Sequence, residues 1–220
     1  MSEQRLFMVE DVWLRAGQAS AYLANMGSKP RHEPPHAWDL VGVFNQKRIA
    51  GEWPSAVNLW QMSWSSLAGR MRHQFGNDAP REEVFERWWT KSSGERSAGW
   101  DRVLLPGEGC PELFDLQAKP LGRCLIQIRT AVRPGASIAH LAWLESVISD
   151  GNVQGPWSPF LWMRAVHSSE TFLYLAGHSW SGVELATRAF ASPPAAFKAR
   201  ATASLLHSWD RSRYLFSDGQ

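Results

Sequence analysis

A run of alternating residues that ends in Ser-Trp-Ser occurs twice in the 220-residue chain and constrains the fold more than any other feature. The first copy spans 57–67 and the second spans 171–183, with Trp64 and Trp180 lying 116 residues apart. The alternation predicts a β-strand in each copy, and the spacing of the apolar residues after it predicts a helix. A serine directly before a helical pattern is a favourable N-cap. The chain is therefore predicted to contain two copies of one strand–helix unit.

Two further anchors repeat in the same order. Arg15-Ala16-Gly17 is matched by Arg133-Pro134-Gly135, and Trp100-Asp101-Arg102 recurs as Trp209-Asp210-Arg211. We interpret the two Trp-Asp-Arg copies as structural residues at helix–strand junctions. Three anchors in one order predict an internal duplication. The expected domains are a first repeat at 1–106, a linker rich in Pro and Gly at 107–121, and a second repeat at 122–220.

Periodicity predicts the same series of elements in each half. The first half has expected strands at 6–14, 40–44, 56–62 and 100–105, and helices from 19 and at 64–75 and 80–90. The second half has expected strands at 124–132, 160–165, 172–178 and from 209, and helices from 138 and at 180–190 and 194–207. The order strand, helix, strand, strand, helix, strand is ferredoxin-like. Because such a sheet leaves one face bare, we predict an α+β fold in which two fused repeats form one pseudo-dimeric barrel.

The segment from Gln127 to Gly135, Gln-Ile-Arg-Thr-Ala-Val-Arg-Pro-Gly, resembles the first-strand signature of the NIPSNAP-like proteins in the dimeric α+β barrel superfamily. The aliphatic strand that runs into a Ser-Leu helix at 59–67 is similar to the same family. Gln127 stands where an acid is common, and the first half has Val9 and Asp11 at the matching positions. The resemblance implies cofactor-independent oxygenation, isomerisation or cyclisation of small molecules, with haem chemistry in some branches. It also implies a barrel that one duplicated chain closes alone, as a monomer or a homodimer.

Composition and missing motifs argue against several classes of function. A formal net charge of +2 without a basic run argues against nucleic acid as a partner. No stretch approaches the ~20 apolar residues of a membrane span, and the N-terminal residues lack a signal-peptide pattern, so we expect a cytoplasmic protein without a membrane partner. The 13 tryptophans suit a pocket for a flat or apolar ligand. Phosphate-binding glycine motifs and common hydrolase motifs are absent from the sequence.

The period of two sorts the strand residues between the two faces of each sheet. Purely aliphatic positions, such as Leu59 and Leu175, are expected under the helices. The predicted inward set of the first half is Val9, Asp11, Phe44, Asn58, Trp60 and Met62. The predicted inward set of the second half is Gln127, Arg129, Trp162, Tyr174, Ala176 and His178. An apolar wall with a few polar groups is typical of small-molecule pockets.

We therefore hypothesise an enzyme that acts on an aromatic or apolar metabolite, with its working site in the second half. His178 and Asp11 are the candidate groups for proton transfer, and Arg129 is the candidate for stabilising negative charge. The candidate substrate-binding residues are Tyr174, Trp162, Gln127, Trp60, Phe44 and Asn58.

Alternatives stay open at each position. His178 can also be interpreted as a structural histidine, and Asp11 and Arg129 as a buried ion pair. The protein could be a non-catalytic binding protein for an apolar ligand. It could also be a haem protein with His140 or His178 as the axial ligand, although no cofactor is the first expectation. No metal site is expected, since His32 and His36 lack a third nearby ligand.

Overall fold

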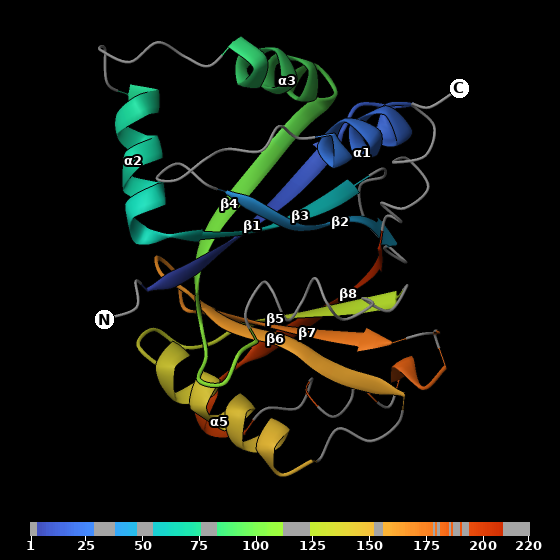
Figure 1. The fold of residues 1–220 in the computed structure, drawn as a ribbon. Coiled ribbons are helices and arrows are strands. Elements are labelled where there is room, and N and C mark those ends of the chain that lie inside the picture. The colour runs from blue at the N-terminus through green and yellow to red at the C-terminus, as the bar shows by residue number, and fades with distance from the viewer. Residues whose placement is uncertain are drawn as a thin grey trace. The chain divides into compact units, whose positions relative to one another are not determined.

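The computed structural model describes residues 4–28, 38–47, 55–75, 83–111, 124–151, 156–177, 179, 181–184, 186, 190 and 194–208 (Figure 1). The chain divides into two compact units. Unit 1 comprises Met1–Asn45, Ala50–Asp101 and Trp209–Gln220, and unit 2 comprises Gln46–Ile49 and Arg102–Ser208. Residues 112–121 of the predicted linker lie outside the described residues.

Unit 1 contains β1 (Arg5–Leu14), α1 (Ala19–Gly27), β2 (Asp39–Lys47), β3 (Ser55–Ser63), α2 (Trp64–Phe75), α3 (Glu83–Gly94) and the start of β4 (Arg96–Pro106). Its hydrogen-bonded strand order is β4-β1-β3-β2. β1 and β3 are antiparallel over nine residue pairs, from Arg5 opposite Ser63 to Trp13 opposite Ser55. The Ser97 hydroxyl of β4 donates to the Trp13 carbonyl of β1 over 3.1 Å.

Unit 2 contains the end of β4, then β5 (Cys124–Ala131), α5 (Ser137–Ser149), β6 (Trp157–Ala165), β7 (Glu170–Gly177), the short helix η1 (Ala195–Phe197) and β8 (Arg200–Ser208). Its strand order is β8-β5-β7-β6, with the last residues of β4 beside β6. β5 is central, since it pairs antiparallel with both β7 and β8.

Both units therefore place their four strands in one order: fourth, first, third, second. Each also turns from its first strand into its first helix at a glycine, Gly17 or Gly135, that has φ +79°. This left-handed conformation is easily reached only without a Cβ. The predicted fold class, an α+β pseudo-dimeric barrel of two fused ferredoxin-like repeats, is confirmed. The duplication that would explain it stays a prediction.

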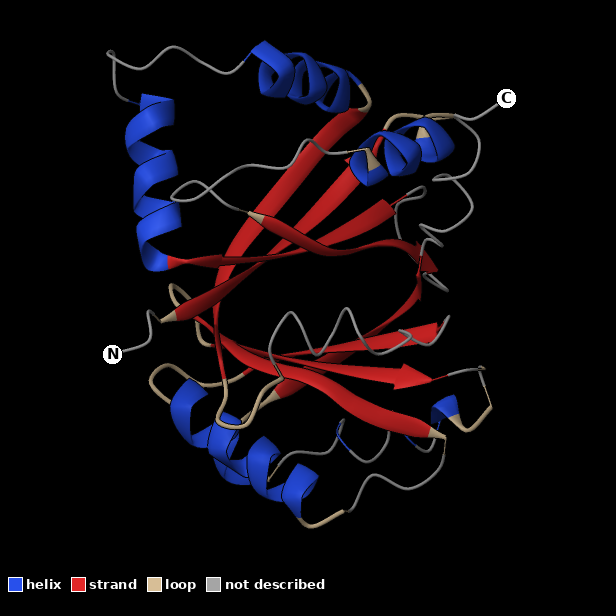
Figure 2. Cartoon of the chain, in the orientation of Figure 1, coloured by secondary structure: helices blue, strands red, loops and turns tan. Residues whose placement is uncertain are grey.

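The helices of each unit define a helix face of its sheet (Figure 2). In unit 1 the Asn58 amide of β3 donates to the Tyr22 hydroxyl of α1 over 2.6 Å, so Asn58 lies on the helix face. In unit 2 the Thr171 hydroxyl of β7 is 2.8 Å from Nδ1 of His140 in α5, so Thr171 lies on the helix face. Because side chains alternate along a strand, these two contacts assign the faces of β3 and β7.

The face prediction is wrong for β3. Asn58, Trp60 and Met62 share the helix face, and Val57 and Leu59 lie on the opposite face. Every side chain from Ala56 to Trp60 is buried. Because both faces of β3 are buried, an aliphatic residue can lie on either face. The alternation of aliphatic and other residues therefore does not identify the helix face.

The face prediction is also wrong for β6. Trp162 lies opposite Leu173, and Arg164 lies opposite Thr171. Trp162 and Arg164 are therefore on the helix face of unit 2. Leu161, opposite Tyr174, is on the other face. The register shifts between Pro159 and Leu161, and one extra residue in a strand exchanges its faces.

The last part of the chain also differs from expectation. Residues 200–208 form β8, where a helix at 194–207 was predicted, and the strand expected from Trp209 lies outside the described residues. Alanine-rich sequence favours helix, but pairing with β5 outweighs that weak preference. The first Trp-Asp-Arg triplet lies inside β4, and α3 runs over Glu83–Gly94 instead of 80–90.

Candidate functional site

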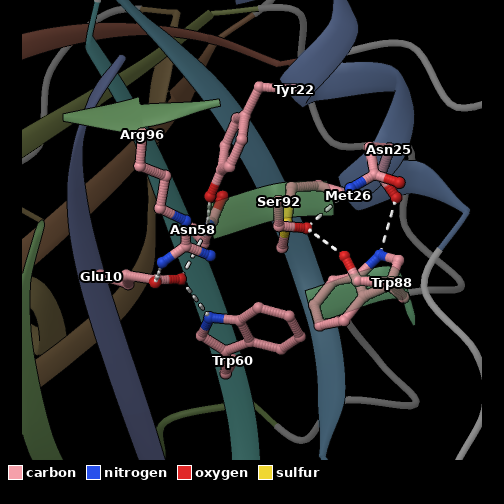
Figure 3. Close-up of polar contacts among 9 residues, drawn as sticks. All are labelled: Glu10, Tyr22, Asn25, Met26, Asn58, Trp60, Trp88, Ser92 and Arg96. Atoms are coloured by element: carbon pink, nitrogen blue, oxygen red, sulfur yellow. Dashed lines mark hydrogen bonds and ion pairs between the residues drawn. The ribbon is translucent and has the colours of Figure 1, made fainter. Parts of the chain in front are cut away.

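A buried carboxylate organises the helix face of unit 1 (Figure 3). Glu10 of β1 lies opposite Asn58 of β3, so the two side chains share a face. Its Oε2 accepts from the Asn58 amide over 2.6 Å and from the Trp60 indole over 3.2 Å. Its Oε1 is ion-paired with Nη1 of Arg96 from β4. A buried charge is costly unless it is paired and hydrogen-bonded, and Glu10 has both kinds of partner.

Two aromatic rings pack against the Arg96 guanidinium. Its central carbon lies 5.4 Å from the centre of the Tyr22 ring and 4.8 Å from that of Trp89. Burial, together with the negative charge of Glu10, raises the pKa of Tyr22 well above its ordinary value. Tyr22 therefore stays a phenol at neutral pH. We refer to Glu10, Tyr22, Asn58, Trp60 and Arg96 as the Glu10 cluster.

A second polar group on the same side joins two helices and is structural. The Asn25 amide of α1 donates to the Ser92 hydroxyl of α3 over 2.7 Å, and the Trp88 indole donates to the Asn25 carbonyl over 2.9 Å. Each donor meets an acceptor, so these contacts fix α1 against α3 and need no ligand.

Unit 2 buries a hydrogen-bonded pair on the face of its sheet away from α5. The Gln127 amide of β5 donates to the Tyr174 hydroxyl of β7 over 2.7 Å, and both side chains are buried. Phe172 and Leu161 share this face by register and are also buried. The result is an oriented phenol among apolar side chains.

An ion-pair network lies at the start of β7. Glu170 Oε1 pairs with Arg129, and its Oε2 accepts from Arg102 over 3.2 Å and from the Ser168 hydroxyl over 2.8 Å. Burial by itself raises the pKa of Glu170, but the Ser168 hydrogen bond and the Arg129 and Arg102 guanidinium groups outweigh it and lower the pKa. Glu170 is thus ionised at neutral pH. The side chain of Arg129 remains 37% exposed and can meet a further anion.

His140 is a buried, neutral imidazole between α5 and the unit 2 sheet. Burial lowers its pKa to about 4. Its ring lies 5.1 Å from the rings of both Trp143 and Phe197, and its Nδ1 contacts Thr171. Within the described part of the chain, its Nε2 has no hydrogen-bond partner.

The structure brings together part of the predicted site. Gln127, Arg129 and Tyr174 share the face of the unit 2 sheet away from α5, as predicted. Asp11 lies on the face of the unit 1 sheet away from α1, also as predicted, since it alternates with Glu10.

Other predicted residues lie elsewhere. Asn58 and Trp60 point toward α1, and Trp162 lies on the α5 side, where its indole donates to the Glu108 carbonyl over 3.1 Å. Phe44 is buried with its ring over Gly42. His178 lies outside the described residues, so its role stays a prediction.

Sequence reasoning missed Glu10, Arg96 and Glu170. One signal was present for Glu10: a carboxylate inside the apolar strand Leu6–Leu14 must find a buried partner. No comparable signal pointed to Arg96 or Glu170, because each lies at the first residue of its strand, where charged residues are ordinary.

Comparison with solved structures supports the fold. A protein of Fusobacterium nucleatum that is provisionally named a monooxygenase matches with a TM-score of 0.61 and 7% identity, over 94% of each chain. An anthrone oxidase-like protein matches with a TM-score of 0.56 and 12% identity, over 94% of this chain and 92% of that one. A haem-binding protein of Thermus thermophilus matches with a TM-score of 0.52 and 11% identity, over 96% of this chain and 93% of that one.

These neighbours confirm the resemblance to dimeric α+β barrel proteins at the level of fold. No family model and no curated protein matches the sequence. Among the described residues, no helix is long and apolar enough to span a membrane, and no group of three His, Cys, Asp or Glu could hold a metal ion.

Proposed function

We propose that the protein is a small-molecule enzyme of the oxygenase type, acting on an aromatic or apolar metabolite in unit 2. The observation that carries the proposal is the buried Gln127–Tyr174 pair beside Phe172 and Leu161, on the face that also carries Arg129. Pockets of this composition hold small molecules by their apolar surface and orient them by a few polar groups. The names of the fold neighbours favour oxygenation over isomerisation or cyclisation. The first-strand segment from Gln127 to Gly135 supports a NIPSNAP-like assignment.

The residues have separate roles in this proposal. Tyr174, held by Gln127, positions an oxygen atom of the substrate. Arg129 stabilises the negative charge that develops when the substrate loses a proton, since Glu170 holds its guanidinium in place and leaves part of it exposed. His178 keeps its predicted role as a proton acceptor, and the role predicted for Asp11 of unit 1 stays a prediction. The deprotonated, electron-rich substrate then reacts with molecular oxygen.

Anthrone is a suitable probe, because it has an acidic C–H bond in a flat aromatic frame. One anthrone and one O₂ would give one anthraquinone and one water, which balances all atoms and electrons. We expect oxygen uptake and a quinone absorption band with the full-length protein, and a loss of at least about tenfold in the rate with Arg129→Met or Tyr174→Phe. The matched control is Ser92→Ala, which also removes a buried hydroxyl but lies between α1 and α3.

Anthrone binding and oxygen uptake, measured together, distinguish an enzyme from a binding protein. Saturable anthrone binding without oxygen uptake would favour a non-catalytic binding protein, the alternative of a different class. Equal rates in Tyr174→Phe, Arg129→Met and the wild type would contradict the assignment of the site to this face.

A haem protein is the second candidate, and His140 favours it. A ligating histidine is neutral and commonly donates from its other ring nitrogen to a nearby acceptor. His140 is neutral above a pKa of about 4, and its Nδ1 contacts the Thr171 hydroxyl. Its Nε2, without a hydrogen bond in the described chain, would be the ligating atom. His140 thus has the properties of a haem ligand, and haem bound to it would supply oxygen or electron-transfer chemistry.

A haem titration decides between the two candidates. Stoichiometric binding with a sharp Soret band in the wild type, and none in His140→Ala, would establish the haem protein. The control is Thr171→Val, which removes the Nδ1 partner and is expected to weaken haem binding without abolishing it. No Soret band after haem addition would eliminate this candidate.

A further inference from the structure

We infer that unit 1 contains a second ligand site, in which Arg96 binds the carboxylate of a small organic acid. The site lies on the helix face, between α1, α3 and the start of β4. It is independent of the proposed function, because none of its residues belongs to the candidate site in unit 2.

The first observation is the free edge of the Arg96 guanidinium. Arg96 uses Nη1 for Glu10, while its Nε and Nη2 are buried and have no hydrogen-bond partner in the described part of the chain. These two nitrogens form one of the parallel-donor edges with which arginine binds both oxygens of a carboxylate. A buried donor without an acceptor is costly, and here two such donors lie side by side.

The second observation is an acceptor beside the same carboxylate. Asn58 Oδ1 is also buried without a partner among the described residues, although its Nδ2 donates to Glu10 and Tyr22. Asn58 and Arg96 both contact the Glu10 carboxylate (Figure 3). Two donors and one acceptor match a carboxylate that carries a hydroxyl or amine nearby.

Local charge favours an anion over a neutral ligand. The Nε of Arg15 donates to the Arg96 carbonyl over 3.0 Å, and both Lys91 and Arg96 act on the carboxyl of Glu95. The charged groups placed here among the described residues are thus the cations Arg15, Lys91 and Arg96 and the carboxyl groups of Glu10 and Glu95. Burial also raises the pKa of Glu95, which favours its neutral form. A bound carboxylate would therefore bring the region closer to neutrality.

The side chain of Trp89 controls the access of a small ligand to Arg96. The ring of Trp89 lies against the guanidinium and is 38% exposed, so Arg96 lies one aromatic ring below the surface. A movement of the Trp89 side chain would open the edge of the guanidinium to solvent.

The experiment titrates the full-length protein, labelled with ¹⁵N-arginine, with benzoate while the Nε–H signals are recorded. Arg96→Lys assigns the Arg96 signal and keeps a cation beside Glu10, but it lacks the parallel donors. We expect the Arg96 signal to shift saturably with benzoate and not with benzamide, which has the same shape without the charge. Arg96→Lys should weaken benzoate binding by about tenfold or more, while Arg87→Lys on the exposed face of α3 leaves it unchanged.

Two outcomes would overturn the inference. The first is an Arg96 Nε–H signal whose chemical shift does not change at high benzoate concentration. That result would mean that water or another group of the chain already accepts the hydrogen bonds of Nε and Nη2. The second is an equal shift with inorganic phosphate, which would indicate a general anion effect and not a carboxylate site. Both readouts use the wild-type protein, and nuclear Overhauser contacts to the Tyr22 and Trp89 rings assign the Arg96 signal if Arg96→Lys does not fold.

Discussion

The two units have the same strand order but differ in the polar groups that they bury on the helix face of the sheet. In unit 1 the Glu10 cluster lies between the sheet and α1. In unit 2 the helix face carries Ile126, Ile128, Leu173 and Leu175 together with the uncharged His140–Thr171 pair, and the Gln127–Tyr174 pair lies on the other side. One topology thus supports two different distributions of charge, and each distribution defines a different place where a ligand could bind.

The largest expected contrast concerns the two buried ion pairs. Arg96→Leu leaves Glu10 charged and buried, which should cost about 3–5 kcal/mol of unfolding free energy. Arg129→Leu leaves Glu170 paired with Arg102 and Ser168, and the Arg129 side chain is 37% exposed, so the loss should be about 1 kcal/mol or less. Urea denaturation of both variants measures the difference. Equal losses would contradict the distinction between Glu10, which has one cationic partner, and Glu170, which has two.

The next contrast is in pH dependence, and it tests the helix face of unit 2. His140 has a folded-state pKa of about 4 against an unfolded value near 6.5, so the unfolded chain binds an extra proton between these values. The stabilising effect of neutral His140 is complete above pH ~6.5 and is lost as the pH falls through this window, by up to about 3 kcal/mol.

Urea denaturation between pH 5 and 7.5 checks this expectation. The slope should be present in the wild type and reduced in His140→Gln, which cannot titrate. Glu170 does not interfere in this range, because its lowered pKa confines its own contribution to more acidic solution. An identical slope in the wild type and in His140→Gln would show that His140 is not buried as described.

The smallest expected effect comes from the two buried tyrosines. Tyr22→Phe and Tyr174→Phe each remove a hydroxyl that accepts from an amide, Asn58 or Gln127, and each should cost about 1 kcal/mol. The two substitutions should therefore lower the free energy of unfolding by similar amounts, whereas substrate turnover should fall with Tyr174→Phe alone. A turnover loss in Tyr22→Phe instead would move the candidate active site to unit 1.

The sequence predicted the topology because the topology depends on element order and turns. The glycine turns at Gly17 and Gly135 and the helix at 64–75 were found within a residue or two. These signals are local, and they do not depend on what packs against either side of a strand.

The faces of β3 and β6 were not predictable by the same means. Alternation assigns a face only where one side meets water, and the residues from Ala56 to Trp60 are buried on both sides. In β6 the irregularity near Pro159 shifts the parity of all later residues. The strand 200–208 was also missed, because its formation depends on the free edge of β5.

The most direct test of the opposite-face account is a map of nuclear Overhauser contacts from the side-chain amides of Asn58 and Gln127. The account predicts contacts from the Asn58 amide to the Tyr22 ring of α1, and from the Gln127 amide to the Tyr174 ring, with none from Gln127 to Leu141 or Leu144 of α5. Contacts from Val57 and Leu59 to Tyr22, with none from Asn58, would contradict the account and restore the face assignment that alternation alone predicts.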